Sequence, residues 1–145
     1  MRPAFPLQTL LELSQTRLDD ATRRLGELMA GERSASERLS LLSQYRSEYH
    51  SRFLAAAQAG LSQDQWRNYQ AFLAKLDGAI RQAQAAAEQS QRHTAAGQQA
   101  WLDKRGEKKA FDTLSQRYRQ RQQYAEQKAE QKAQDEHAAR PKEPD

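Results

Sequence analysis

The chain has 145 residues, of which 37% are hydrophobic, 29% are charged and none is cysteine. This composition is too polar for a globular domain with a thick core, and the lack of cysteine excludes disulfides, thiolate metal sites and cysteine nucleophiles. The formal net charge is +4, and residues 101–132 hold nine Lys and Arg against five Asp and Glu. The sequence therefore indicates a helical protein with a basic segment in its later part.

No run of residues approaches the ~18 consecutive apolar side chains of a transmembrane helix. The opening residues also lack the apolar core of a signal peptide. We therefore expect a soluble cytoplasmic protein without direct membrane insertion. At this length we expect one domain, an antiparallel coiled-coil hairpin over residues 1–140.

The first predicted helix runs from about residue 6 to residue 58. Pro6 suits its first position, because the missing N–H would be unpaired there anyway. Apolar residues then recur with a 4-3 spacing, which predicts a coiled-coil seam. The seam positions are Ala4, Leu7, Leu11, Ser14, Leu18, Ala21, Leu25, Leu28, Glu32, Ala35, Leu39, Leu42, Arg46, Tyr49, Phe53 and Ala56.

A turn near residues 58–62 separates this helix from a second one, predicted over about residues 63–138. Ser62 is a good N-cap, and Gln65 three residues later can complete a capping box. Leu61 before the cap and Trp66 in the first turns of the helix form an expected hydrophobic staple.

The second helix carries its own seam, which is strong near the turn and thins at Ser90, Thr94 and Gly97. Leu114 lies beside the later part of the seam and is a candidate to replace Ser115 in it. Beyond Tyr118 the helix outruns the first one as a C-terminal extension. Pro141 ends any helix, and residues 141–145 are expected to be a disordered tail. The apolar seam positions are Trp66, Tyr69, Leu73, Leu76, Ile80, Ala83, Ala87, Trp101, Phe111, Tyr118, Ala125 and Ala129.

The short connection between two long helices favours antiparallel packing. The fold class is therefore all-α, a long antiparallel two-helix coiled coil. In the register that we predict, the two residue numbers of each facing pair of seam residues add up to 122. Phe53 then faces Tyr69, Leu25 faces Gly97, and Ala21 faces Trp101.

We find no catalytic, cofactor-binding or metal-binding set in the sequence, so the protein is not expected to be an enzyme. His50, His93 and His137 are far apart in the predicted register, and solvated helix-surface histidines are the simpler interpretation. The sequence also contains no phosphate-binding glycine loop, metal-ligand spacing or nucleophile elbow.

Two features point instead to binding. The basic stretch over residues 104–121 could contact nucleic acid, form a solvated face or bind a protein, and its interrupting acidic residues favour a protein. Phe72 and Ala79 lie beside the seam and form a stripe with Leu76 and Ala83, with Tyr45 nearby on the other helix. Apolar surface outside a two-stranded seam often marks a contact site.

Three segments are distinctive: FPLQTLLEL at residues 5–13, WRNYQAFL at residues 66–73 and WLDKR at residues 101–105. Together they resemble the flagellar FliJ family. The resemblance extends to about residue 135, and the length, the lack of cysteine and the basic, Gln-rich ending agree with it.

This resemblance implies a non-enzymatic component of the flagellar type III export apparatus at the cytoplasmic side of the inner membrane. It implies a coiled coil similar to a rotary ATPase stalk that binds and stimulates the hexameric export ATPase ring, contacts the membrane export gate and escorts export chaperones. No cofactor and no nucleic acid are expected as partners.

The implied contacts form two sets, which we name the gate set and the charged set. The gate set matches the family's exposed patch near the turn half of the hairpin, and the charged set is chosen by charge and location near the chain ends. The gate set is Leu42, Tyr45, Tyr49, Phe72, Leu76 and Ala79, and the charged set, for the ATPase, is Arg17, Arg23, Arg24, Lys104, Arg105, Lys108 and Lys109.

Two alternatives remain open from the sequence. One is the equivalent stalk of a virulence injectisome. The other is a generic scaffold or nucleic-acid-binding coiled coil, which differs in that phosphate binding weakens steeply with salt.

Overall fold

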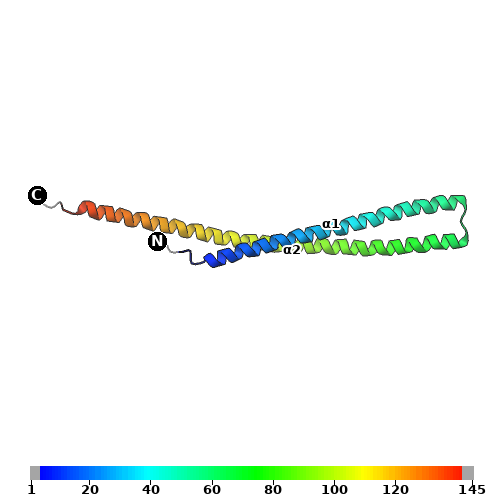
Figure 1. The fold of residues 1–145 in the computed structure, drawn as a ribbon, viewed down its shortest axis with the longest axis horizontal. Helices are drawn as coiled ribbons and strands as arrows, with labels where there is room; N and C mark the ends of the chain where they lie inside the picture. The colour runs from blue at the N-terminus through cyan, green and yellow to red at the C-terminus, as the bar shows by residue number, and fades with distance from the viewer. Residues whose placement is uncertain (1–3, 142–145) are drawn as a thin grey trace. The chain divides into compact units, whose positions relative to one another are not determined.

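The computed structural model describes residues 4–141, which contain two helices and no strand. Helix α1 spans Gln8–Ala59 and helix α2 spans Gln63–Ala139. The two helices pack against each other as an antiparallel hairpin, so the predicted all-α fold is confirmed (Figure 1). The expected ranges were 6–58 and 63–138. The later start of α1 reflects a turn in which Gln8 N donates to Phe5 O at 3.0 Å.

The packing divides the chain into two compact units. The turn unit is Ala21–Trp101, and the terminal unit combines the residues up to Asp20 with those from Leu102 onward. The single domain over residues 1–140 therefore stays a prediction. Apart from Pro141, the predicted disordered tail lies outside the described residues.

The connection between the helices is built from local hydrogen bonds. Gln65 N donates to Ser62 Oγ at 3.2 Å, and Ser62 N donates to Gln65 Oε1 at 3.0 Å. The predicted capping box is therefore confirmed, with each residue satisfying an otherwise unpaired amide of the other. Gly60 has a φ of 99°, a left-handed conformation that glycine adopts without the steric cost of a Cβ.

The register in the turn unit follows the predicted pairing. The Phe53 and Tyr69 rings lie 5.4 Å apart, and Thr94 Oγ1 donates to Leu28 O at 3.2 Å. At the far end of this unit, Trp101 Nε1 donates to Thr22 Oγ1 at 2.9 Å. The buried apolar residues of this unit are Phe53, Leu73, Leu76, Ala83 and Ala87, all of them predicted seam positions.

The terminal unit keeps the same register. Tyr118 OH donates to Ala4 O at 3.3 Å, and the Phe5 and Tyr118 rings lie 5.5 Å apart. Its two buried polar residues are Ser14 and Ser115. The Ser14 hydroxyl donates to Leu11 O at 2.7 Å, so a carbonyl of its own helix accepts its hydrogen bond.

Leu114 does not replace Ser115 in the seam. Leu114 exposes 41% of its surface, whereas Ser115 exposes 5%. The 4-3 spacing runs through Phe111, Ser115 and Tyr118, so Leu114 points one position away from the helix partner. Helix geometry therefore outweighs the hydrophobicity of the larger side chain at this layer.

Candidate functional site

The gate set lies wholly within the turn unit and is centred on an aromatic cluster. The ring of Phe72, on α2, lies 4.5 Å from that of Tyr49 and 6.3 Å from that of Tyr45, both on α1. The Tyr45 contact is edge-on, at an interplanar angle of 83°. Such tilted and edge-on pairs add to the stabilisation that comes from buried area, so the cluster holds its side chains in place.

The members of the gate set differ in how much surface they offer. Tyr45 exposes 43% of its surface, and Leu42, Tyr49, Phe72 and Ala79 are half-buried. Leu76 exposes only 7%, because it lies in the seam. Leu76 can therefore support a contact surface from below but offers little surface itself.

Tyr49 is half-buried within this cluster. Burial raises the pKa of Tyr49, and the neighbouring phenols of Tyr69 and Tyr45 raise it further. Because both effects disfavour the phenolate, the Tyr49 hydroxyl stays neutral at physiological pH. The centre of the gate set is therefore an uncharged aromatic surface.

The charged set is divided between the two units. Arg23 and Arg24 lie exposed on the turn unit, where Arg24 Nη1 is 3.6 Å from Glu27 Oε2. Arg17 and the remaining members of the set belong to the terminal unit. Each part of the set is therefore described within its own unit.

On the terminal unit, two of the lysines are held by carboxylates one turn away. Lys104 Nζ lies 3.5 Å from Glu107 Oε1, and Lys108 Nζ lies 2.6 Å from Asp112 Oδ2. Their stems occupy seam positions while their amino groups reach the surface, as expected for a long amphipathic side chain. Arg105 and Lys109 are exposed beside them.

An ion pair that the sequence analysis missed joins the helices next to the gate set. Arg46 Nε donates to Asp77 Oδ1 at 2.5 Å. The Arg46 guanidinium lowers the pKa of Asp77, and the same hydrogen bond raises the pKa of Arg46. The signal in the sequence was a charged residue at a seam position, which needs an opposite charge nearby when its stem is covered.

His50 was expected to be solvated, and this was wrong for one of its ring nitrogens. Its Nδ1 is buried without a hydrogen-bond partner among the described residues, and its ring lies 6.1 Å from that of Phe53. His50 follows the seam residue Tyr49 directly, so the aromatic layer beneath it shields one edge of the imidazole.

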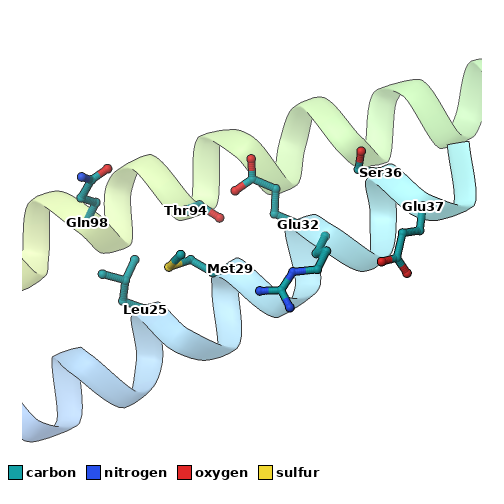
Figure 2. A pocket seen from close by; sticks show the side chains of 8 residues that line it. Leu25, Met29, Glu32, Ser36, Glu37, Thr94 and Gln98 are labelled. Atoms are coloured by element: carbon teal, nitrogen blue, oxygen red, sulfur yellow. The ribbon is translucent and has the colours of Figure 1, made fainter. Parts of the chain in front are cut away.

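A shallow hollow lies elsewhere on the turn unit, where the α2 seam has only small side chains. Figure 2 shows Leu25 and Met29 on α1 near Thr94 and Gln98 on α2. The hollow has a volume of about 470 Å³, and its α1 rim carries two carboxylates and one guanidinium. It contains no member of either predicted contact set. Its lining residues are Leu25, Met29, Glu32, Arg33, Ser36, Glu37, Thr94 and Gln98.

Residues 4–141 contain neither a cluster that could hold a metal ion nor a helix that could span a membrane. No group of three or more His, Asp or Glu side chains in this range is arranged to hold a metal ion. None of the helical segments in the same range combines the length and the apolarity that a membrane span requires.

The family model and two relatives that this chain resembles bear the same name. A family model described as "Flagellar FliJ protein" matches residues 3–141. A flagellar FliJ protein of Salmonella typhi is 34% identical over 111 residues, covering 77% of this chain and 76% of the relative. The one from Escherichia coli strain K12 is 33% identical over the same length and with the same coverage.

Proposed function

Because the chain belongs to the flagellar FliJ protein family, and is therefore a component of the flagellar export apparatus, we propose that it acts there as a non-enzymatic, stalk-like coiled coil. It binds and stimulates the hexameric export ATPase, contacts the membrane export gate and escorts export chaperones. It works on the cytoplasmic side of the inner membrane, to which it is bound peripherally through the gate.

The observation that supports the proposed contact with the export gate is the exposed edge of the aromatic cluster. Tyr45 and Phe72 come from different helices and meet edge-on at the surface, beyond what a two-stranded seam has to bury. Aromatic side chains that are held in place lose little conformational entropy on binding, and they often dominate the energy of an interface. Leu42, Tyr49 and Ala79 extend this surface, and Leu76 supports it.

The gate contact is tested by measuring the affinity of the full chain for the soluble part of the cognate gate protein. Phe72→Ala should weaken binding by about tenfold or more, as for truncation of an aromatic anchor. Leu54→Ala removes an exposed apolar side chain on α1 outside the gate set and should leave the affinity unchanged. Equal affinities for both variants would remove the gate contact from this surface.

The ATPase contact is assigned to the charged set. A protein that binds an assembled ring more tightly than separate subunits shifts the equilibrium toward the ring. Exposed cations such as Arg23 and Arg24 suit this role, since they can reach carboxylates of several subunits without requiring a deep pocket.

ATP hydrolysis by the cognate export ATPase, with and without the full chain, tests this contact. The intact chain should raise the rate, and the double variant Arg23→Glu with Arg24→Glu should lose most of the increase. Phe72→Ala should retain it, because the gate set is a different surface. A failure of the intact chain to stimulate hydrolysis or ring assembly would contradict the stalk role.

For the escort of export chaperones, we assign no contact residues. A titration of each cognate export chaperone, without cargo, against the full chain would detect a complex by size-exclusion chromatography with light scattering. Binding of cargo-free chaperone that is lost when cargo is added would support escort. Equal binding with and without cargo would contradict it.

A further inference from the structure

Two adjacent hollows on the terminal unit lie outside both contact sets. One has a volume of about 230 Å³ and is lined by residues around the start of α1 and by Leu114, Tyr118 and Arg121 of α2. The other has a volume of about 310 Å³ and is lined by Arg117, Gln120, Arg121 and Tyr124. They share Arg121, so they form one continuous surface. We name it the Arg121 patch, consisting of Pro6, Leu114, Arg117, Tyr118, Arg121 and Tyr124.

The patch offers apolar surface on a fixed support. Leu114 and Tyr124 are both exposed, with 65% of the Tyr124 surface accessible. Tyr118, which lines the same hollow as Leu114, packs on Phe5 and donates to the Ala4 carbonyl. Exposed apolar side chains beside such a support are typical of a protein contact surface.

The charges of the patch are all positive. Neither Arg117 nor Arg121 makes an ion pair with another residue of the 4–141 range. By contrast, Lys104 and Lys108 on the same helix are paired with carboxylates. Lys128 Nζ adds a further cation 5.9 Å from the centre of the Tyr124 ring. No acidic side chain lines either hollow.

The spacing of these residues along α2 indicates the shape of the partner. Leu114, Arg117, Arg121 and Tyr124 are separated by three, four and three residues, so they lie along one face of the helix. Beyond the Tyr118–Ala4 contact, α2 continues to Ala139, and every described residue after Gln122 is exposed. A partner helix could therefore lie along this face.

We propose that the Arg121 patch docks an acidic amphipathic helix of a partner protein. The apolar stripe of that helix would cover Leu114 and Tyr124, and its flanking carboxylates would pair with Arg117 and Arg121. Bidentate pairing suits the planar guanidinium groups. This contact uses no residue of the gate set or the charged set, so it goes beyond the proposed function.

The test uses two synthetic helical peptides with the same leucine stripe, one flanked by glutamates and the other by lysines. Fluorescence anisotropy with the full chain should detect binding of the acidic peptide only. The double variant Arg117→Glu with Arg121→Glu should weaken it by about tenfold or more, since two charge pairs become repulsive. Leu114→Ser should also weaken it, which a purely electrostatic contact would not require.

The matched control is the double variant Arg67→Glu with Arg92→Glu, which reverses two exposed arginines of α2 within the turn unit. It should bind the acidic peptide as the unchanged chain does, and circular dichroism should show equal helicity for all variants. Equal binding of both peptides, or an unaffected Arg117/Arg121 variant, would overturn the proposal. Binding of single-stranded DNA at these arginines without binding of the acidic peptide would overturn it in favour of a nucleic-acid site.

Discussion

Arg46 Nε donates to Asp77 Oδ1 at 2.5 Å, across 31 positions of sequence and from one helix to the other. Both side chains are about two-fifths exposed, so water screens the pair and its contribution to stability is small. The pair nevertheless joins α1 to α2 directly, within the unit that holds Tyr45 and Phe72. It also makes the stability of the folded chain depend on pH.

Asp77→Asn should destabilise the protein at neutral pH and have no effect at low pH. The pKa of Asp77 is lowered in the folded state. Its stabilising contribution is therefore complete above the ordinary Asp pKa of about 3.9 and is lost as the pH falls through the lower folded value. Thermal melts followed by circular dichroism between pH 2 and pH 7 would measure the difference from the unchanged chain.

The exposed Asp135, far along α2, provides the matched control for this series. Asp135→Asn should differ little from the unchanged chain at any of these pH values. A protonated Asp77 carboxyl no longer pairs with Arg46 as an ion. A difference in stability between Asp77→Asn and the unchanged chain that widens below pH 4 would therefore contradict a stabilising Arg46–Asp77 ion pair.

Gly97→Ala should fail to stabilise the protein, although alanine is the better helix former. A methyl group at Gly97 would lie 2.5 Å from Leu28 Cδ1 and 3.8 Å from Leu25 Cδ1. Leu28 would have to leave its rotamer, and overpacking of this kind costs about 1 kcal/mol or more. This cost offsets the gain of about 1 kcal/mol in helix propensity. Urea denaturation would measure the net change.

Gly26→Ala is the corresponding control, because a methyl group there meets nothing within 4 Å. It should raise the free energy of unfolding by about 0.5–1 kcal/mol. Equal stabilisation by both substitutions would show that Gly97 is not needed for the close packing of Leu28.

Ser62→Ala should destabilise the hairpin by about 1 kcal/mol, the usual cost of losing an N-cap. The hydroxyl accepts the Gln65 amide at 3.2 Å, and the substitution leaves that amide without its acceptor. Ser40→Ala, at an exposed position inside α1, removes a hydroxyl without a capping role and should not destabilise. Thermal unfolding of both variants checks the difference. Equal losses would contradict the capping assignment.

Phe53→Ala should cost about 3 kcal/mol of stability, within the range for a large buried aromatic side chain. The Phe53 ring lies 5.1 Å from the Trp66 ring and 5.4 Å from the Tyr69 ring, so both of these rings lose a contact. The tryptophan fluorescence, to which Trp66 and Trp101 both contribute, should change as the Trp66 ring loses this contact. Denaturant unfolding with fluorescence detection measures both effects.

The neighbouring Leu54 is exposed and points away from this layer. Leu54→Ala should change the free energy of unfolding by less than about 0.5 kcal/mol, as for most surface positions. Similar losses for Phe53→Ala and Leu54→Ala would contradict the predicted seam.

The pattern of the sequence determined most of the fold. The 4-3 spacing predicted which residues turn inward, and the facing pair Phe53 with Tyr69 is observed in contact. The capping box at Ser62 was predicted from two residue types three positions apart and is observed in both directions. These features depend on helix periodicity and on local hydrogen bonds, which neighbouring residues determine by themselves.

Only the tertiary structure decided which partners the polar side chains at the edge of the seam find and how far they are buried. The sequence could not tell that His50 Nδ1 is buried without a hydrogen-bond partner among the described residues, or that Arg46 pairs with Asp77. Each outcome depends on which side chain of the opposite helix occupies the adjacent space and on the charge that it carries. That information lies tens of residues away in sequence and becomes local only when the two helices pack together.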